Sequence, residues 1–85
     1  MFSFRAPIVR SSAPGGWTYV VMPDSVERLG TGGRVAVSGT IDGEPVTTSF
    51  MALGDGTHKL PVTAALLKKV GKTIGDEVEV HVERR

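Results

Sequence analysis

Glycine and proline occur so often in this chain that no secondary-structure element can be long. The 85 residues include eleven glycines and five prolines, and both residue types interrupt helices and strands. The segments between them are short, and several alternate apolar with polar residues, as the last one does at Val78, Val80 and Val82. Alternation with a period of two is typical of strands that bury one face. The sequence therefore predicts a small, mostly β chain.

Length and composition limit the classes of protein that the chain can represent. Residues 1–85 are expected to form a single domain with one modest core, as a monomer or a weak homodimer. The absence of cysteine excludes disulfides and thiolate metal sites. The N-terminus does not resemble a secretory signal, and no apolar run is long enough to span a membrane, so we expect a cytoplasmic protein. No cofactor is expected.

Two short helices are expected between the strands. Asp24 is a candidate N-cap for a helix over residues 25–29, which Gly30 would end. Pro61 is expected to begin a second helix, which Gly71 would end. Residues 54–58 are expected to form a loop. The expected strands cover residues 2–8, 17–22, 34–41, 45–53 and 77–83.

The clearest local signal is a hairpin centred on Asp42-Gly43. An Asp-Gly pair suits a type I′ turn, in which both central residues have positive φ. A two-residue loop sets the register, so that Val35 faces Phe50 and Val37 faces Thr48. The apolar members of this set predict the core face of the hairpin, and Thr48 is the one polar side chain expected on it.

The chain also contains a weak internal repeat. Each copy runs from a strand through Met-Pro or Leu-Pro to a helix, a glycine turn and a strand with two alternating valines; the copies begin near Gly16 and Gly56. Two such halves could pair about an internal pseudo-twofold axis and close a small barrel with two short helices. Closure would remove the exposed edges of the sheet.

The same motifs carry a resemblance to known families. The second half-unit, from Leu60-Pro61 to Val80, resembles the swapped-hairpin element of AbrB-type transcription factors and antitoxins. The whole chain is similar to a prokaryotic family called domain of unknown function nineteen-oh-five. The residues that carry this similarity are Gly16-Trp17, Pro23-Asp24-Ser25, Val37 with Gly39 to Gly43, Ser49, Gly54 to His58, Leu60-Pro61-Val62, Gly71 and Gly75-Asp76.

The resemblance implies a fold and leaves the activity open. It implies a double-split β-barrel with AbrB-like half-units, in a family often joined to a bacteriocin-protection (OmpD-associated) domain. That family has no agreed biochemical activity. Two positions depart from its pattern, since Ala52 stands where proline is common and Leu67 where a helix arginine is common. If that arginine serves a ligand in relatives, the function could differ here.

No pattern of residues predicts catalysis. The glycine pairs at Gly30-x-Gly32 and Gly54-x-Gly56 lack the continuation of a phosphate-binding loop, which favours turns. His58 near Asp55 could contact a ligand, but two such groups are too few for a metal site. No Gly-x-Ser-x-Gly elbow occurs, and the acidic residues have turn and cap positions. The sequence therefore leans away from an enzyme.

A candidate ligand site can still be named from the predicted topology. Thr48 is expected to point inward and to need a hydrogen-bond partner, while His58 and Lys59 follow in the next loop. The repeat makes that loop the counterpart of Gly16-Trp17, so we expect Trp17 and His58 to share one mouth of the barrel. The alternative is structural, with Thr48 bonded to a backbone carbonyl and Trp17 capping the core.

Three functions follow in order of preference. The first is a non-catalytic binding or interaction module with a protein or small-molecule partner. The second is a small-ligand-binding barrel with weak chemistry at His58. The third is an AbrB-like nucleic-acid binder, which the net charge of +1 disfavours. That function would require one basic face, formed by Arg5, Arg10, Lys59, Lys68, Lys69 and Lys72.

Overall fold

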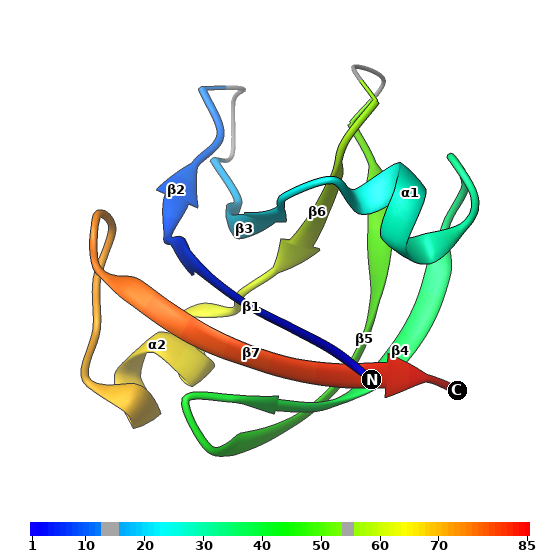
Figure 1. Ribbon diagram of the computed structural model, residues 1–85. Coiled ribbons are helices and arrows are strands. Elements are labelled where there is room, and N and C mark those ends of the chain that lie inside the picture. Colours follow the sequence, from blue (N-terminus) through cyan, green and yellow to red (C-terminus); the bar gives the residue numbers. More distant parts are fainter. Residues whose placement is uncertain (13–15, 54–55) are drawn as a thin grey trace.

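The chain folds as one sheet that curls into a nearly closed barrel, with two short helices (Figure 1). The structure, a computed structural model, describes residues 1–12, 16–53 and 56–85. Gly54 and Asp55, expected in a loop, lie outside these residues. The elements are β1 Phe2–Pro7, β2 Val9–Arg10, β3 Thr18–Met22, α1 Ser25–Leu29, β4 Val35–Ile41, β5 Glu44–Ala52, β6 His58–Pro61, α2 Ala64–Val70 and β7 Glu77–Arg84.

The N-terminal stretch brings the two edges of the sheet together. The strand order is β1-β7-β4-β5-β6-β3-β2, so the outer strands are consecutive in sequence. The chain passes from β1 to β2 at Ile8, whose N–H donates to the Asp76 carbonyl and whose carbonyl accepts from the Gly75 N–H. The N-terminal stretch thus pairs with β7 through β1 and with β3 through β2. The barrel is closed on this side, whereas β5 pairs with β6 only through Met51 and Ala52.

The Asp42-Gly43 hairpin is confirmed in both its turn and its register. Asp42 has φ 49° and Gly43 φ 83°, as a type I′ turn requires. Val35 pairs with Phe50 and Val37 with Thr48. Val35, Val37 and Phe50 are buried, so the predicted core face is the observed one.

The strand register also contains the predicted pseudo-twofold relation. In the β3–β6 pair, Val20 lies opposite Leu60 and Met22 opposite His58, so a half-turn about the central Val21–Lys59 pair exchanges the two strands. In the β4–β7 pair, the same exchange is centred on Gly39 and Val82. The two helices accordingly lie at opposite ends of the barrel (Figure 1). The repeat in the sequence is therefore a symmetry of the fold.

The core is formed by the inward faces of the strands, and each helix contributes one buried apolar side chain to it. Leu29 of α1 and Leu66 of α2 are the helical members. The alternating residues of the first and last strands are buried as predicted, except that Phe2 is only half-buried. None of the helices in the described ranges has the length and apolar character needed to cross a membrane.

The predicted bounds of α1 are confirmed, but the cap expected from Asp24 and the predicted start of α2 are wrong. Asp24 does precede α1, but its backbone has φ 53° and its side chain makes no cap hydrogen bond, so the helix begins without the expected carboxylate cap. Pro61 does not begin α2. It is the last residue of β6, where it pairs with Tyr19, and Thr63 caps the helix by accepting a hydrogen bond from the Leu66 N–H. Sheet pairing therefore overrides the preference of proline for a helix start.

Candidate functional site

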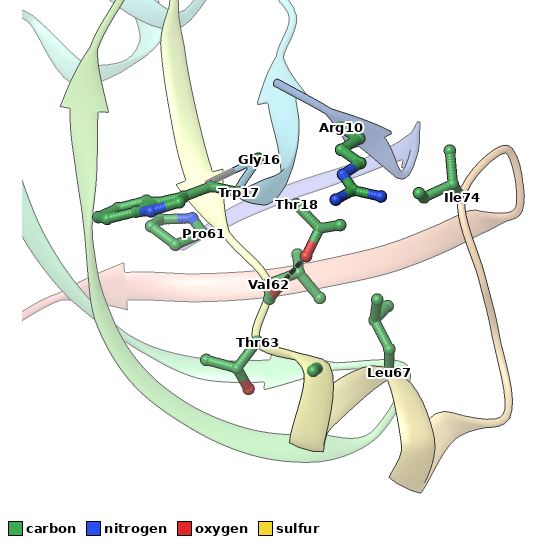
Figure 2. Close-up of a pocket in the computed structure, with 10 residues that line it drawn as sticks. Arg10, Gly16, Trp17, Thr18, Pro61, Val62, Thr63, Leu67 and Ile74 are labelled. Atoms are coloured by element: carbon green, nitrogen blue, oxygen red, sulfur yellow. Dashed lines mark hydrogen bonds between the residues drawn. The ribbon is translucent and has the colours of Figure 1, made fainter. Parts of the chain in front are cut away.

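A cavity of about 440 Å³ opens between the start of β3 and helix α2 (Figure 2). Its walls come from elements that are distant in sequence, because β2 and β6 pair with the two edges of β3. The volume lies within the range of about 300–1,000 Å³ typical of small-molecule sites. The apolar side chains of the wall are Trp17, Pro61, Val62, Ala64, Leu67 and Ile74.

Trp17 forms one side of the cavity without entering the core. Its side chain is 59% exposed, so the expectation that it caps the core is wrong. The ammonium group of Lys59 lies 5.6 Å from the centroid of a Trp17 ring and 5.5 Å from that of Tyr19. These distances are typical of cation–π contacts. The sole tryptophan of the sequence is therefore an exposed aromatic surface next to an apolar hollow.

The floor of the cavity has its polar groups paired within the protein. The Thr18 hydroxyl donates to the carbonyl oxygen of Val62. The Thr18 carbonyl in turn accepts from the Val62 N–H at 3.0 Å. Because these groups satisfy one another, a bound molecule meets mainly carbon atoms there. The floor is thus suited to an apolar group.

Arg10 supplies the charge of this site. It ends β2 and, with Ile74, lies across Thr18 from Trp17 (Figure 2). Its guanidinium group lies over the backbone of Gly16, where a Cβ atom would stand only 2.6 Å from the Arg10 Nε. Gly16 also has φ 30°, which a residue with a side chain rarely adopts. Glycine at position 16 therefore permits this placement of Arg10.

His58 lies inside the fold and its ring nitrogens have partners there. The residue is fully buried and begins β6, so the predicted loop at this position is wrong. Its Nε2–H donates to the Gly33 carbonyl at 2.8 Å, which leaves Nδ1 to accept from the Ser25 hydroxyl at 2.8 Å. The ring also meets Phe50 edge-on, with centroids 6.4 Å apart. His58 thus links helix α1, the turn that follows α1 and the hydrophobic core to one another.

Trp17 and His58 do not share a mouth of the barrel. His58 pairs with Met22 at one end of the β3–β6 ladder. Trp17 precedes β3 at the other end, where Tyr19 pairs with Pro61. The pseudo-twofold axis passes between them, so equivalent positions fall at opposite ends. The expectation of a shared mouth is therefore wrong, although Lys59 does lie beside Trp17.

Thr48 lies apart from the Trp17 cavity. Its side chain is half-buried and contributes to a separate hollow of about 280 Å³ between the hairpin and α2. Glu44 and Lys69 lie at the same hollow. The four residues named from the sequence are thus divided among three places, and only Trp17 and Lys59 are together. A ligand role for Thr48 stays a prediction.

Two carboxyl groups are held ionised by contacts that stabilise the barrel. Burial acts to raise the pKa of Asp42, but the N–H of Glu79 and the ammonium of Lys72, 2.6 Å away, outweigh it and lower the pKa. The pKa of Glu79 is lowered by its hydrogen bond from His81 and by Arg5. The Asp42 carboxyl joins the hairpin turn to β7, the Glu79 carboxyl joins β7 to β1, and neither lines the cavity.

Within residues 1–12, 16–53 and 56–85, no cluster of three potential metal ligands occurs. Asp55, the possible companion of His58, lies outside these ranges. Of the described residues that line the cavity, sequence reasoning named only Trp17 as a site residue and missed the others, among them Arg10, Leu67 and Ile74. The Gly16-Trp17 pair was the available signal, but placing Arg10 beside it requires the β2–β3 pairing.

The comparison with protein families gave one result that covers nearly the whole chain. Residues 4–82 match the model of a family described as a domain of unknown function, DUF1905. A search of curated proteins found no significant match. The family match agrees with the resemblance seen in the glycine, proline and histidine motifs.

Proposed function

The chain belongs to the DUF1905 family, and we propose that it is a non-catalytic binding module whose ligand is a small apolar molecule held in the Trp17 cavity. One observation carries this proposal. Trp17 and Ile74 are 59% and 47% exposed, yet both border the same apolar hollow. Large apolar side chains gathered at an exposed concavity are typical of binding sites.

The chemistry of the cavity supports binding more than catalysis. The Thr18 and Val62 groups of the floor are paired with each other, and His58 is buried at the far end of the β3–β6 ladder. Among the described residues that line the cavity, none is a histidine, a carboxylate or a lysine. A general acid–base mechanism needs such a group within reach of the substrate. The proposal therefore assigns the site recognition alone.

The experiment measures binding of 4-phenylbutyramide, a neutral molecule with one aromatic ring. Intrinsic fluorescence reports on wild type, because Trp17 is the only tryptophan. For the variants, isothermal calorimetry and ligand-detected NMR replace it. We expect Trp17→Ala to weaken binding by about tenfold, since one aromatic contact is lost. Val26→Ala is the matched control, because Val26 is an exposed apolar residue outside the cavity and should leave the affinity unchanged.

A protein partner is the alternative occupant of this surface. If neither the amide nor 4-phenylbutyrate binds, or if Trp17→Ala leaves the affinity unchanged, the small-molecule proposal is wrong and an interaction module is favoured. The oligomeric state, as monomer or weak homodimer, stays a prediction that sedimentation over a range of concentrations tests. The prokaryotic cytoplasm as the location of the protein also stays a prediction.

Nucleic acid is a weaker candidate for the partner. The net charge is +1, and two members of the expected basic face are paired with acids. Arg5 lies 3.3 Å from Glu79, and Lys72 lies 2.6 Å from Asp42. Phosphate recognition needs cations that are free to replace counterions. Because Arg5 and Lys72 are already paired with carboxylates, the expected basic face is less suited to duplex DNA.

A further inference from the structure

Arg10 has no acidic partner within the described ranges, and it is the cation that lies at the Trp17 cavity. Arg5 and Lys72 form ion pairs, and Lys59 lies over two aromatic rings. Arg10 is exposed, and its guanidinium lies along the backbone of Gly16 at the rim of the Trp17 cavity. An arginine has five N–H donors and no acceptor. Arg10 therefore presents donors to whatever occupies the cavity.

The charges around the cavity all have one sign. Of the described lining residues, Arg10 alone is charged. The next cation is Lys59, whose ammonium lies against the Trp17 ring. No carboxylate among the described lining residues opposes them. A cavity with one sign of charge and low-dielectric walls attracts a ligand of opposite sign.

The placement of the groups also limits the shape of the ligand. Figure 2 shows Trp17 and Pro61 on one side of Thr18 and Arg10 on the other, with Leu67 rising from α2 below. A molecule that covers Trp17 and reaches Arg10 must cross the apolar floor at Thr18 and Val62. It therefore needs an apolar body and an acceptor group at one end.

We infer that the ligand of this cavity is an apolar carboxylic acid in its anionic form, with the carboxylate bound by Arg10 and the apolar body lying over Val62 toward Trp17. This inference rests on the proposed function. The planar guanidinium fork matches a carboxylate and can bind both of its oxygens. One cation in an otherwise apolar wall suits a single negative charge better than the double charge of a phosphate monoester.

The test compares 4-phenylbutyrate with 4-phenylbutyramide, which have nearly the same shape and differ in charge. Wild type should bind the acid at least about tenfold more tightly than the amide, the factor that a charge-assisted hydrogen bond supplies. Arg10→Gln should bind both with the wild-type affinity for the amide. Arg10→Lys, which keeps the charge but not the fork, should retain part of the preference.

Two control variants test whether the preference for the acid depends on Arg10 and not on another cation. Arg34→Gln removes an exposed arginine that borders a different cavity and should keep the full preference for the acid. Lys59→Met removes the neighbouring cation and should also keep most of it. Thermal melts show that each variant is folded before affinities are compared.

The outcomes distinguish failure of the carboxylate inference from failure of the proposed function. Equal affinity of wild type for acid and amide overturns the carboxylate inference and leaves the binding site in place. A preference that survives Arg10→Gln, or that disappears only in Lys59→Met, overturns the role of Arg10. If neither molecule binds, the proposed function fails and the inference fails with it.

Discussion

Gly39 lies directly against the backbone of His81. A Cβ atom at position 39 would stand 2.0 Å from the His81 carbonyl oxygen, far inside the contact distance of these atoms. Gly39 pairs with Val82 at the centre of the β4–β7 ladder. The two halves of the barrel thus pack backbone against backbone at a residue that has no side chain.

The Gly39–His81 contact predicts that Gly39→Ala destabilises the fold by about 2–3 kcal/mol, because backbone atoms must move to admit the methyl group. Gly32→Ala is the control, since a Cβ atom there has no neighbour within 4 Å. It should change the free energy of unfolding by no more than about 0.5 kcal/mol. Urea denaturation measures both, and equal midpoints would show that the strands separate readily at Gly39.

The type I′ turn predicts a second destabilisation. Gly43→Val should cost about 1–3 kcal/mol, because valine must adopt the φ of 83° that Gly43 has. Thr47→Val, an exposed change in the same hairpin, should have little effect. A thermal melt of Gly43→Val that matches wild type would contradict this account of the turn.

His58 is expected to contribute to stability and not to ligand binding. His58→Ala should lower the free energy of unfolding by about 2–4 kcal/mol, since it leaves a cavity and removes the partners of Ser25 and Gly33. His81→Ala, at a position where the side chain is 41% exposed, should cost much less. Chemical denaturation gives both values. A folded His58→Ala that loses affinity for 4-phenylbutyramide would instead place the residue in the site.

Acid pH should weaken the fold partly through Asp42. Burial acts to raise the pKa of Asp42, but the Glu79 N–H and Lys72 outweigh it, so the folded pKa lies below its ordinary value of 3.8. The ionised group therefore stabilises the fold above about pH 4, and this contribution is lost as the pH falls through the folded pKa. Asp42→Asn keeps a residue suited to the turn and removes the charge.

Melts of wild type and Asp42→Asn over this pH range test the contribution. The variant should be less stable by up to about 1 kcal/mol at neutral pH, as for a partly exposed ion pair, and the difference should shrink in acid. Lys72→Met should give the same pattern. A difference that is independent of pH would mean that the carboxylate charge is not involved.

We expect no specific binding to duplex DNA. Any complex should dissociate between about 50 mM and 200 mM salt, as contacts to phosphate alone do. Gel shifts with two unrelated sequences measure this. A complex that survives the higher salt concentration and prefers one sequence would restore the AbrB-like function.

The features that were predictable from sequence are those in which close neighbours in the chain decide the structure. Asp42-Gly43 and the alternating residues beside it determine a turn and a register without help from elsewhere. The helix ends at Gly30 and Gly71 are likewise local, since both adopt the left-handed conformation that favours glycine. The repeat was predictable for the same reason, because each half contains its own signals.

The features that were not predictable depend on pairing between distant strands. Pro61 has a local preference for a helix start, yet Tyr19 holds it in a strand. His58 sits in a glycine-rich segment that reads as a loop, and its partners Ser25 and Gly33 come from another part of the chain. Arg10 reaches the cavity only because β2 pairs with β3. The candidate site is therefore mostly a product of topology.

The closure of the barrel by its N-terminal stretch has a consequence for synthesis. β1 leaves the ribosome before every other strand of the domain, yet its partner β7 leaves last. Such a pairing closes the longest loop in the domain, and contacts of high sequence separation slow folding. Until β7 emerges, Phe4 and Ala6 lack the strand residues that they pair with in the fold, Val80 and Val78. The pairing that closes the barrel can therefore form only after translation of its final strand.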